Sequence, residues 1–146
     1  MAEPYKLTAE GLEEYKHEYH HLIDVEREQN KIALQEARAL GDLSENSDYD
    51  FAKSEQARIE TRIKQIEEII KNHTIISGEK IEIEFLETGQ VKVFQIVGVL
   101  ETDPANGKIS TETPIAKAIK GKKAGDMLTY KGGNGKEIQI KIKGYV

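Results

Sequence analysis

A short acidic stretch, residues 41–50, holds the side chains best suited to chemistry. It places four carboxylates within nine residues and contains no lysine or arginine: Asp42, Glu45, Asp48 and Asp50. Carboxylate oxygens are the ligands that hard cations such as Mg²⁺ and Ca²⁺ prefer. Long helical patterns flank the stretch on both sides, so we expect a turn between two helices to carry these groups.

The spacing of these acids does not match a calcium-binding EF-hand loop. A loop starting at Asp42 needs glycine at its sixth position and glutamate at its twelfth, where Ser47 and Lys53 stand. A partial Mg²⁺ site fits better, because Asp42 and Glu45 are three residues apart and can face one way at a helix start. Two carboxylates bind Mg²⁺ weakly, so the remaining ligands would come from another molecule.

Each chemical interpretation has a structural alternative. Acidic side chains also stabilise the N-terminus of a helix without any ligand. Residues 17–21 match the zinc-peptidase pattern H-E-x-x-H. However, His17 lies about 200° round the helix from Tyr15, so exposed surface histidines are the favoured interpretation. Arg38 and Lys53 flank the acidic stretch, where they either contact phosphates or are solvated.

Two long helices are expected to position the acidic stretch. Thr8 is a suitable N-cap, no proline follows it before Leu40, and Gly41 is a suitable C-terminal cap. This arm would be roughly 50 Å long at 1.5 Å per residue. Its first seam residues are Leu12, Tyr15, Tyr19 and Leu22, and the same step continues through Glu26, Gln29, Ala33, Glu36 and Leu40.

The return helix has a clearer heptad seam, formed by Ala52, Gln56, Ile59, Ile63, Ile66 and Ile70. Because only a few residues connect the two helices, they must run antiparallel. A hairpin of this length is mostly surface and cannot bury a compact core. We therefore interpret it as a device that carries the acidic stretch to a distant place.

The second half of the chain changes from helical to alternating patterns near residue 78. Strands are predicted over 81–85, 91–100, 108–110, 126–130 and 136–143, with a short helix beginning at Pro114. The fold class is therefore α+β. An antiparallel two-helix coiled coil over residues 1–77 precedes a small antiparallel β domain over residues 78–146.

Composition narrows the class of protein. The 146-residue chain has a formal charge of −5, which argues against a general nucleic-acid binder. Residues 1–77 carry 10 basic and 17 acidic side chains, whereas residues 78–146 carry 11 and 9. The chain contains no cysteine, which excludes disulfides and thiolate chemistry. No segment has the apolar length of a membrane span or a signal peptide, so we expect a soluble, cytoplasmic protein.

Three motifs resemble the bacterial Gre-type transcription elongation factors. The sequence GDLSENSDYDFAK at residues 41–53 resembles the tip motif of that family. Residues 109–126 are similar to its second signature, and LTAEGLEEY at residues 7–15 fits as well. The motifs agree in order and spacing over nearly the whole chain, and they are closer to the A-type than to the B-type factor.

The resemblance implies a fold and a function. Family members join a coiled coil to a domain similar to FK506-binding proteins. They dock at the rim of the secondary channel of RNA polymerase and insert the coiled coil into it. The polymerase's own activity then cuts the extruded RNA 3′ end of a backtracked complex. The factor is not an enzyme by itself, and the resemblance implies a monomer without sequence-specific DNA binding or membrane association.

The resemblance also assigns roles to residues of this chain. It implies that Asp42 and Glu45 supply ligands for a second Mg²⁺ in the polymerase active site and orient water, although the isolated chain holds no cofactor. Four residues would support the tip: Ser44, Asn46, Asp48 and Tyr49. Arg38 and Lys53 would contact RNA. Four residues would dock on the polymerase: Thr113, Pro114, Ile115 and Ala116. The alternative is a family member that occupies the same channel without stimulating cleavage.

Overall fold

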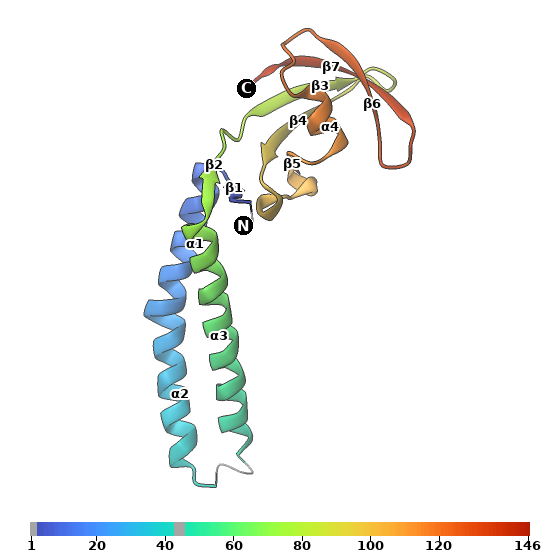
Figure 1. Cartoon of the computed structure of the whole chain (residues 1–146). Coiled ribbons are helices and arrows are strands. Elements are labelled where there is room, and N and C mark those ends of the chain that lie inside the picture. Colours follow the sequence, from blue (N-terminus) through green and yellow to red (C-terminus); the bar gives the residue numbers. More distant parts are fainter. Residues whose placement is uncertain (1–2, 43–45) are drawn as a thin grey trace. The chain divides into compact units, whose positions relative to one another are not determined.

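The computed structural model describes residues 3–42 and 46–146, which form two compact units (Figure 1). The first unit is a helical hairpin, Leu12–His73. The second contains the N-terminal residues up to Gly11 together with Thr74–Val146, and it is built around a β-sheet. None of the helices in the described ranges has the length and apolar content needed to cross a membrane.

The structure divides the chain differently from the sequence-based boundary at residue 77. The N-terminal residues group with the second unit because β1 (Tyr5–Leu7) pairs with β2 (His73–Ile75). The backbone amide of Ile76 also donates to the carbonyl of Leu7 at 2.8 Å. Short strands so far apart in sequence carry too little periodic pattern to be recognised before they pair.

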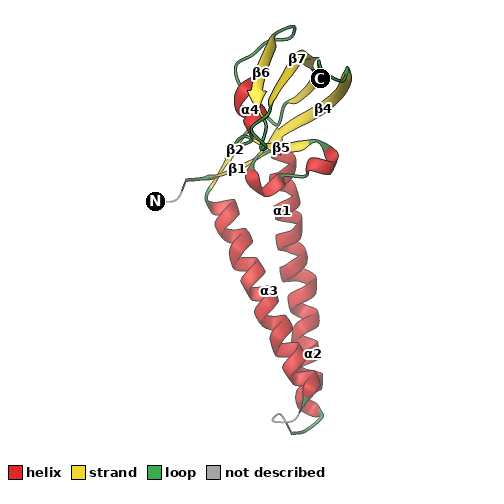
Figure 2. Ribbon diagram, turned by 90° about the vertical axis from the view of Figure 1, so that its right-hand side faces the viewer, coloured by secondary structure: helices red, strands yellow, loops and turns green. Residues whose placement is uncertain are grey.

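The hairpin has the antiparallel arrangement that the sequence predicts (Figures 1 and 2). Its first arm consists of α1 (Ala9–His21), a π-helical segment (Leu22–Glu26) and α2 (Arg27–Ala39), and its second arm is α3 (Ser47–Lys71). The core of the hairpin contains Leu22, Ile59, Ile63 and Ile66, with Tyr15, Tyr19, Ile23 and Ile70 packed against it. The predicted seam of the return helix is therefore confirmed at its isoleucines, and Gln56 is half-buried.

The π-helical segment shifts the buried face of the first arm by one residue. The amide of Arg27 donates to the carbonyl of Leu22, five residues earlier, so this turn contains one extra residue. The predicted seam is consequently wrong beyond this turn, where four of its residues are exposed: Gln29, Ala33, Glu36 and Leu40. The buried residues lie one position later, at Asn30, Leu34 and Ala37.

Ion pairs join the two arms along the hairpin. Arg62 donates to the Glu18 carboxylate at 2.6 and 2.9 Å, and Arg27 donates to Glu60 at 2.8 Å from two nitrogens. The pairs connect early residues of one arm to late residues of the other, as antiparallel packing requires. The arginine at Glu18 holds the pKa of that carboxyl below its ordinary value of 4.5, mainly through the hydrogen bond and against the opposing effect of partial burial.

The second unit contains a five-stranded sheet in the order β5-β4-β3-β7-β6. Its strands are β3 (Lys80–Phe85), β4 (Gln90–Val97), β5 (Lys108–Ser110), β6 (Met127–Lys131) and β7 (Glu137–Tyr145). The pairs β3–β4, β3–β7 and β6–β7 are antiparallel, as predicted. The edge strand β5 instead pairs with β4 in parallel. Two short 3₁₀ segments, Val99–Glu101 and Pro104–Asn106, lead the chain back so that β5 pairs with the last three residues of β4, from Gln95 to Val97.

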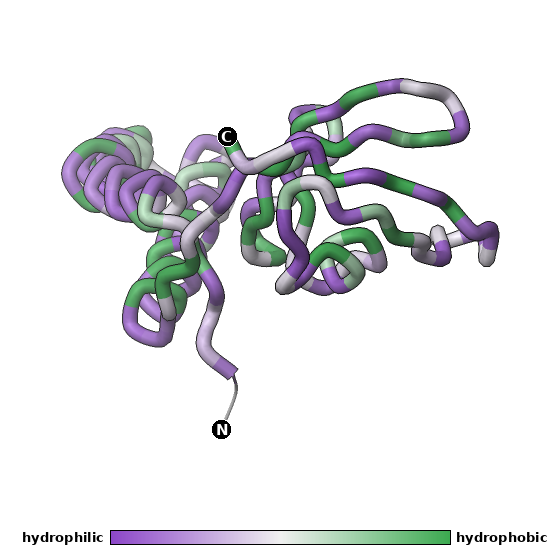
Figure 3. Tube along the Cα trace, turned by 90° about the horizontal axis from the view of Figure 1, so that it is seen from above, coloured by the Kyte–Doolittle hydropathy of each residue, from purple (hydrophilic) through white to green (hydrophobic). Residues whose placement is uncertain are grey.

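One face of this sheet forms the core of the second unit. The helix α4 (Pro114–Ile119) contributes to a cluster of eight buried residues: Ile81, Ile83, Ile109, Ile115, Ala116, Ile119, Ile140 and Ile142. Figure 3 shows hydrophilic and hydrophobic residues alternating along the strands, which is the pattern of a sheet with one buried face. The two glutamates of β3, which alternate with its buried isoleucines, thus belong to the opposite face.

The start of α1 is fixed by a cap that is itself hydrogen-bonded. The Thr8 hydroxyl accepts from the Gly11 amide at 3.1 Å, which confirms the predicted N-cap. The Glu101 carboxylate in turn accepts from the Thr8 amide at 2.8 Å. Thr8 is buried, and its amide and hydroxyl would destabilise the fold if they had no hydrogen-bond partners. These bonds supply the partners.

A close backbone contact predicts a strict requirement for glycine at position 98. A Cβ atom placed on Gly98 would overlap the carbonyl oxygen of Lys6, and a backbone atom cannot move aside cheaply. We expect Gly98→Ala to lower the free energy of unfolding by about 1–3 kcal/mol, measured by urea denaturation. Gly133→Ala is the matched control, because a Cβ there meets open space. If both variants were equally stable, position 98 would not require glycine, and the prediction would be wrong.

The Glu18–Arg62 pair predicts a specific dependence of stability on pH. The pKa of Glu18 is lower in the folded chain than its ordinary value of 4.5. The ion pair therefore stabilises the fold fully above pH 4.5, and this stabilisation is lost as the pH falls through the folded-state pKa. We expect Glu18→Gln to cost ~0.5–1 kcal/mol at pH 7, since the pair is partly exposed, and much less at pH 3. Urea midpoints at both pH values measure this. Glu13→Gln, in the more exposed pair with Lys16, is the matched control and should change the urea midpoint at pH 7 by less than Glu18→Gln.

Candidate functional site

The hairpin turn begins with the predicted glycine cap. The helix α2 ends at Ala39, Leu40 is its C-cap, and Gly41 follows with a φ of +113°. A side chain is strained at positive φ, so glycine is the suitable residue for leaving the helix here. The Gly41 amide donates to the Arg38 carbonyl at 3.3 Å, which closes the last turn of the helix.

Asn46 joins the two arms at the start of α3. Its side-chain oxygen accepts from the Tyr49 amide at 3.1 Å, which makes it the N-cap of α3. Its Nδ2 donates to the Ala37 carbonyl in the last turn of α2 at 2.6 Å. One side chain therefore caps α3 and also holds it against α2. This gives the predicted supporting role of Asn46 a defined geometry.

The acidic side chains of the turn lie where solvent and a partner can reach them. Asp42 is exposed directly after α2, and Asp48 and Asp50 are exposed in the first turn of α3. The positions of Glu45 and Ser44 lie outside the described residues, so the pairing of Asp42 with Glu45 stays a prediction. Within residues 3–42 and 46–146, no three His, Cys, Asp or Glu side chains are grouped closely enough to hold a metal ion.

The two predicted RNA-contact residues lie on opposite arms. The Arg38 guanidinium carbon is 5.9 Å from the centroid of the Tyr49 ring, so this cation lies against an aromatic face close to the turn. Lys53 donates to Gln56 at 3.1 Å along the surface of α3. Tyr49 is half-buried and so connects the turn, the cap and the arginine. The turn thus presents both acidic and basic side chains.

The histidines of the zinc-like pattern lie on the surface of α1. His17, His20 and His21 are exposed, as the position of His17 relative to Tyr15 predicts. His21 Nε2 lies 3.8 Å from a Glu26 oxygen. The structure thus confirms that His17 is exposed. This exposure was the reason for interpreting these residues as surface histidines.

The four predicted docking residues fall at the start of α4. The Thr113 hydroxyl donates to the Ser110 carbonyl at 2.9 Å and accepts from the Ala116 amide at 3.3 Å, which caps the helix. Pro114 is exposed, whereas Ile115 and Ala116 are buried in the core of the second unit. The surface at this point therefore consists of Thr113 and Pro114, and the two buried residues fix the helix beneath them.

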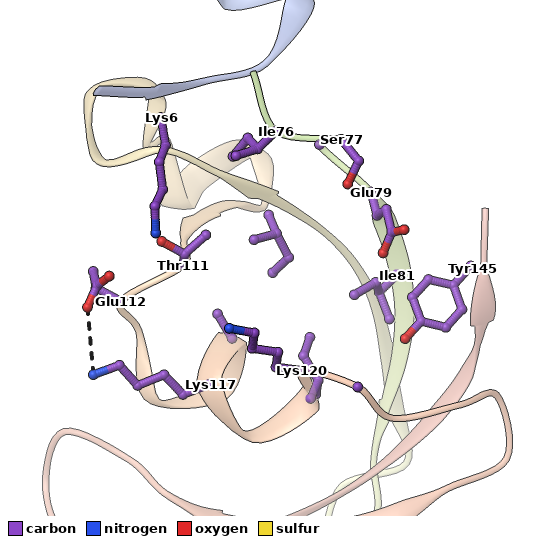
Figure 4. A pocket seen from close by; sticks show the side chains of 15 residues that line it. Lys6, Ile76, Ser77, Glu79, Ile81, Thr111, Glu112, Lys117, Lys120 and Tyr145 are labelled. Carbon is purple, nitrogen blue, oxygen red and sulfur yellow. Dashed lines mark ion pairs between the residues drawn. The ribbon is translucent and has the colours of Figure 1, made fainter. Parts of the chain in front are cut away.

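A pocket of about 380 Å³ lies beside α4 (Figure 4). Its apolar lining includes Ile81, Ile96, Ala116 and Ile119. Three lysines, Lys6, Lys117 and Lys120, also line it, and Lys117 lies 3.7 Å from a Glu112 oxygen. Lys117 and Lys120 belong to α4 and its C-terminal end. The contribution of Lys6 was not recognisable in the sequence, because only the folded chain brings the N-terminal strand to this place.

Both halves of the chain match known protein families. The family model "Transcription elongation factor, N-terminal" matches residues 5–75, and "Transcription elongation factor, GreA/GreB, C-term" matches residues 70–144. The chain is 46% identical to the transcription elongation factor GreA of Acholeplasma laidlawii, covering 95% of this chain and 94% of that protein. It is 44% identical to that of Thermoanaerobacter pseudethanolicus, covering 88% and 89%.

A solved structure was also matched. The Thermus aquaticus Gfh1 crystal structure is 28% identical, covers 99% of each chain and has a TM-score of 0.45.

The Thr113 cap predicts a measurable contribution to the stability of the second unit. Thr113→Ala removes the acceptor of the Ala116 amide, so we expect unfolding to cost about 1 kcal/mol less. Thr113→Ser keeps a capping hydroxyl and should stay close to the parent. Urea denaturation of the three proteins measures this, and a Ser variant as unstable as the Ala variant would contradict the capping role.

Proposed function

The chain belongs to the GreA/GreB family of transcription elongation factors, and from this premise we propose that it stimulates transcript cleavage by bacterial RNA polymerase. In this proposal the hairpin enters the secondary channel of a backtracked, arrested polymerase. The polymerase then cuts its own RNA 3′ end, and the chain is not an enzyme by itself. The observation that carries the proposal is an acidic turn at the end of a long hairpin, in a chain that matches both family models.

The dimensions of the hairpin support this role. The 25 residues of α3 span about 38 Å at 1.5 Å per residue. The residues of the turn lie at the end of this span, and a narrow two-helix element can enter a channel that a globular unit cannot. The acidic excess of this half also repels duplex DNA, so the hairpin does not compete with the nucleic acid that the polymerase holds.

Asp42 and Glu45 have the chemistry for the active-centre role. Carboxylate oxygens fit Mg²⁺, and Asp42 is exposed at the end of the hairpin where it can approach a partner. Two metal ions in a polymerase site would stabilise the attacking and leaving oxygens of the hydrolysis. Asp42 and Glu45 would supply ligands that the backtracked polymerase lacks, and they would orient water toward the RNA phosphate.

Neighbouring residues would hold the turn and its RNA. Asn46 caps α3 through the Tyr49 amide, and the Tyr49 ring lies beside Arg38. Arg38 and Lys53 would then contact phosphates of the extruded 3′ segment. Asp48 lies in the first turn of α3, where a carboxylate favours the helix N-terminus and so stabilises the start of that arm.

The second unit would supply the docking surface. Thr113 and Pro114 present the start of α4, and the adjacent pocket combines an apolar lining with three lysines. This chemistry suits a polymerase surface that offers an apolar side chain surrounded by acidic residues. Docking and catalysis would therefore depend on different units of the chain.

The test of this proposal uses bacterial RNA polymerase stalled in a backtracked complex with 3′-labelled RNA and Mg²⁺. We expect the parent to release short labelled fragments, and Asp42→Ala/Glu45→Ala to reduce the cleavage rate by at least about 100-fold, because the ligands of a metal are lost. Asp50→Ala is the matched control, since it removes another exposed acid near the turn.

Two outcomes would contradict the proposal. Cleavage that survives the loss of both carboxylates would exclude them from the active centre. No cleavage by the parent, together with slowed RNA synthesis, would instead indicate a regulator that occupies the channel without stimulating hydrolysis.

A further inference from the structure

A buried asparagine interrupts the apolar seam of the first arm. Asn30 is only 9% exposed and lies in the same buried stripe as Leu34 and Ala37. Its Nδ2 donates to the carbonyl of Ala52 on α3 at 2.9 Å. A buried amide is costly unless it is hydrogen-bonded, so the position is specific for a side chain that reaches this carbonyl.

A second asparagine makes the reciprocal contact. Asn46, at the start of α3, donates to the Ala37 carbonyl of α2 at 2.6 Å. The two bonds therefore cross between the arms in opposite directions, and each ends on the backbone of a buried alanine. A side chain as small as alanine lets the partner's amide reach the main chain. Each helix is thus tied to a backbone atom of the other rather than to a flexible side chain.

Apart from the buried Leu34, the other contacts at this end of the hairpin define its register poorly. Three large apolar side chains are largely exposed there: Ile32 at 55%, and Leu40 and Phe51 at 69% each. The interhelical ion pairs use long, partly exposed side chains that can follow a small displacement of one arm. The main apolar cluster is formed by Leu22 with Ile59, Ile63 and Ile66, farther along the arms from the turn.

We propose that Asn30 and Asn46 form a register lock, defined as these two side chains with the carbonyls of Ala52 and Ala37. The lock prevents α3 from sliding along α2, and so it fixes where the acidic turn is presented. It rests on the proposed cleavage function, in which the asparagines are positioning residues and touch no substrate. Packed helices slide by roughly 1–2 Å in known transitions, and a misplacement of about 1 Å can cost on the order of 100-fold in rate.

The lock predicts that stability and function respond in opposite directions. A polar residue at a buried coiled-coil position specifies register at a cost in stability. Asn30→Leu should therefore fold with an unchanged or higher melting temperature, yet allow the arms to adopt several registers. A role limited to stability predicts the reverse, namely a less stable hairpin with a single register.

The register can be measured directly, because the sequence contains no cysteine. Spin labels on Gln35→Cys and Ser54→Cys, two exposed positions on opposite arms, report the distance between the arms by pulsed electron paramagnetic resonance. We expect one narrow distribution for the parent and a broader or shifted one for Asn30→Leu. Leu34→Ala is the matched control, since it weakens the same seam but keeps both lock bonds, and it should keep the narrow distribution.

Asn46→Asp tests the lock without removing the cap. Aspartate caps a helix as well as asparagine does, but a carboxylate cannot donate to the Ala37 carbonyl. This variant should also broaden the distribution, and it carries the test if Asn30→Leu does not fold. A distribution identical to the parent's in the folded variants would overturn the lock.

The cleavage assay then tests the positioning role. At saturating concentration, we expect Asn30→Leu to cleave about tenfold to 100-fold more slowly than the parent, with an unchanged half-saturating concentration because the docking surface is intact. Leu34→Ala should cleave at the parent rate. Full cleavage by a variant with a broadened distribution would overturn the positioning role. If the parent itself fails to cleave, the proposed function fails, while the distance measurement still decides whether the lock exists.

Discussion

The structure of the hairpin depends on the narrow interface between its two arms. Two helices without a third partner can bury only one stripe each, so every buried position has a large share in holding them together. Isoleucines and Leu22 provide this burial along one part of the interface. Close to the turn the buried apolar side chains are Leu34, Ala37 and Ala52, and asparagine-to-carbonyl bonds are added to them. The interface therefore gains directional bonds as it approaches the acidic residues.

The sequence predicted those parts of the molecule that local rules determine. The caps at Thr8 and Gly41 and the helix start at Pro114 are as expected, because each depends on the chemistry of one residue or on one φ angle. The isoleucine seam of α3 and the alternation of β3 were also predictable from their periods. For the candidate site, the acidic and basic residues around the turn could be identified from the sequence, but their partners could not.

The parts that were not predicted depend on contacts between distant residues or on a local defect in a pattern. A five-residue π-turn looks like any helical segment in the sequence, yet it moves the buried face from Gln29 to Asn30. The parallel pairing of β5 and the contribution of Lys6 to the pocket arise only when the chain has folded. The bond from Asn46 to the Ala37 carbonyl was not predictable either, since it depends on how α2 lies against α3.

The extra residue of the π-helical segment also determines the direction in which the end of the hairpin faces. Each residue of an α-helix turns the chain by about 100° around the axis. If the same residues formed a regular α-helix through Leu22–Glu26, every side chain beyond this segment would be rotated by about that angle, and Gln29 rather than Asn30 would face α3. The azimuth of the turn is therefore encoded some fifteen residues away from it, at a place where no side chain takes part in chemistry.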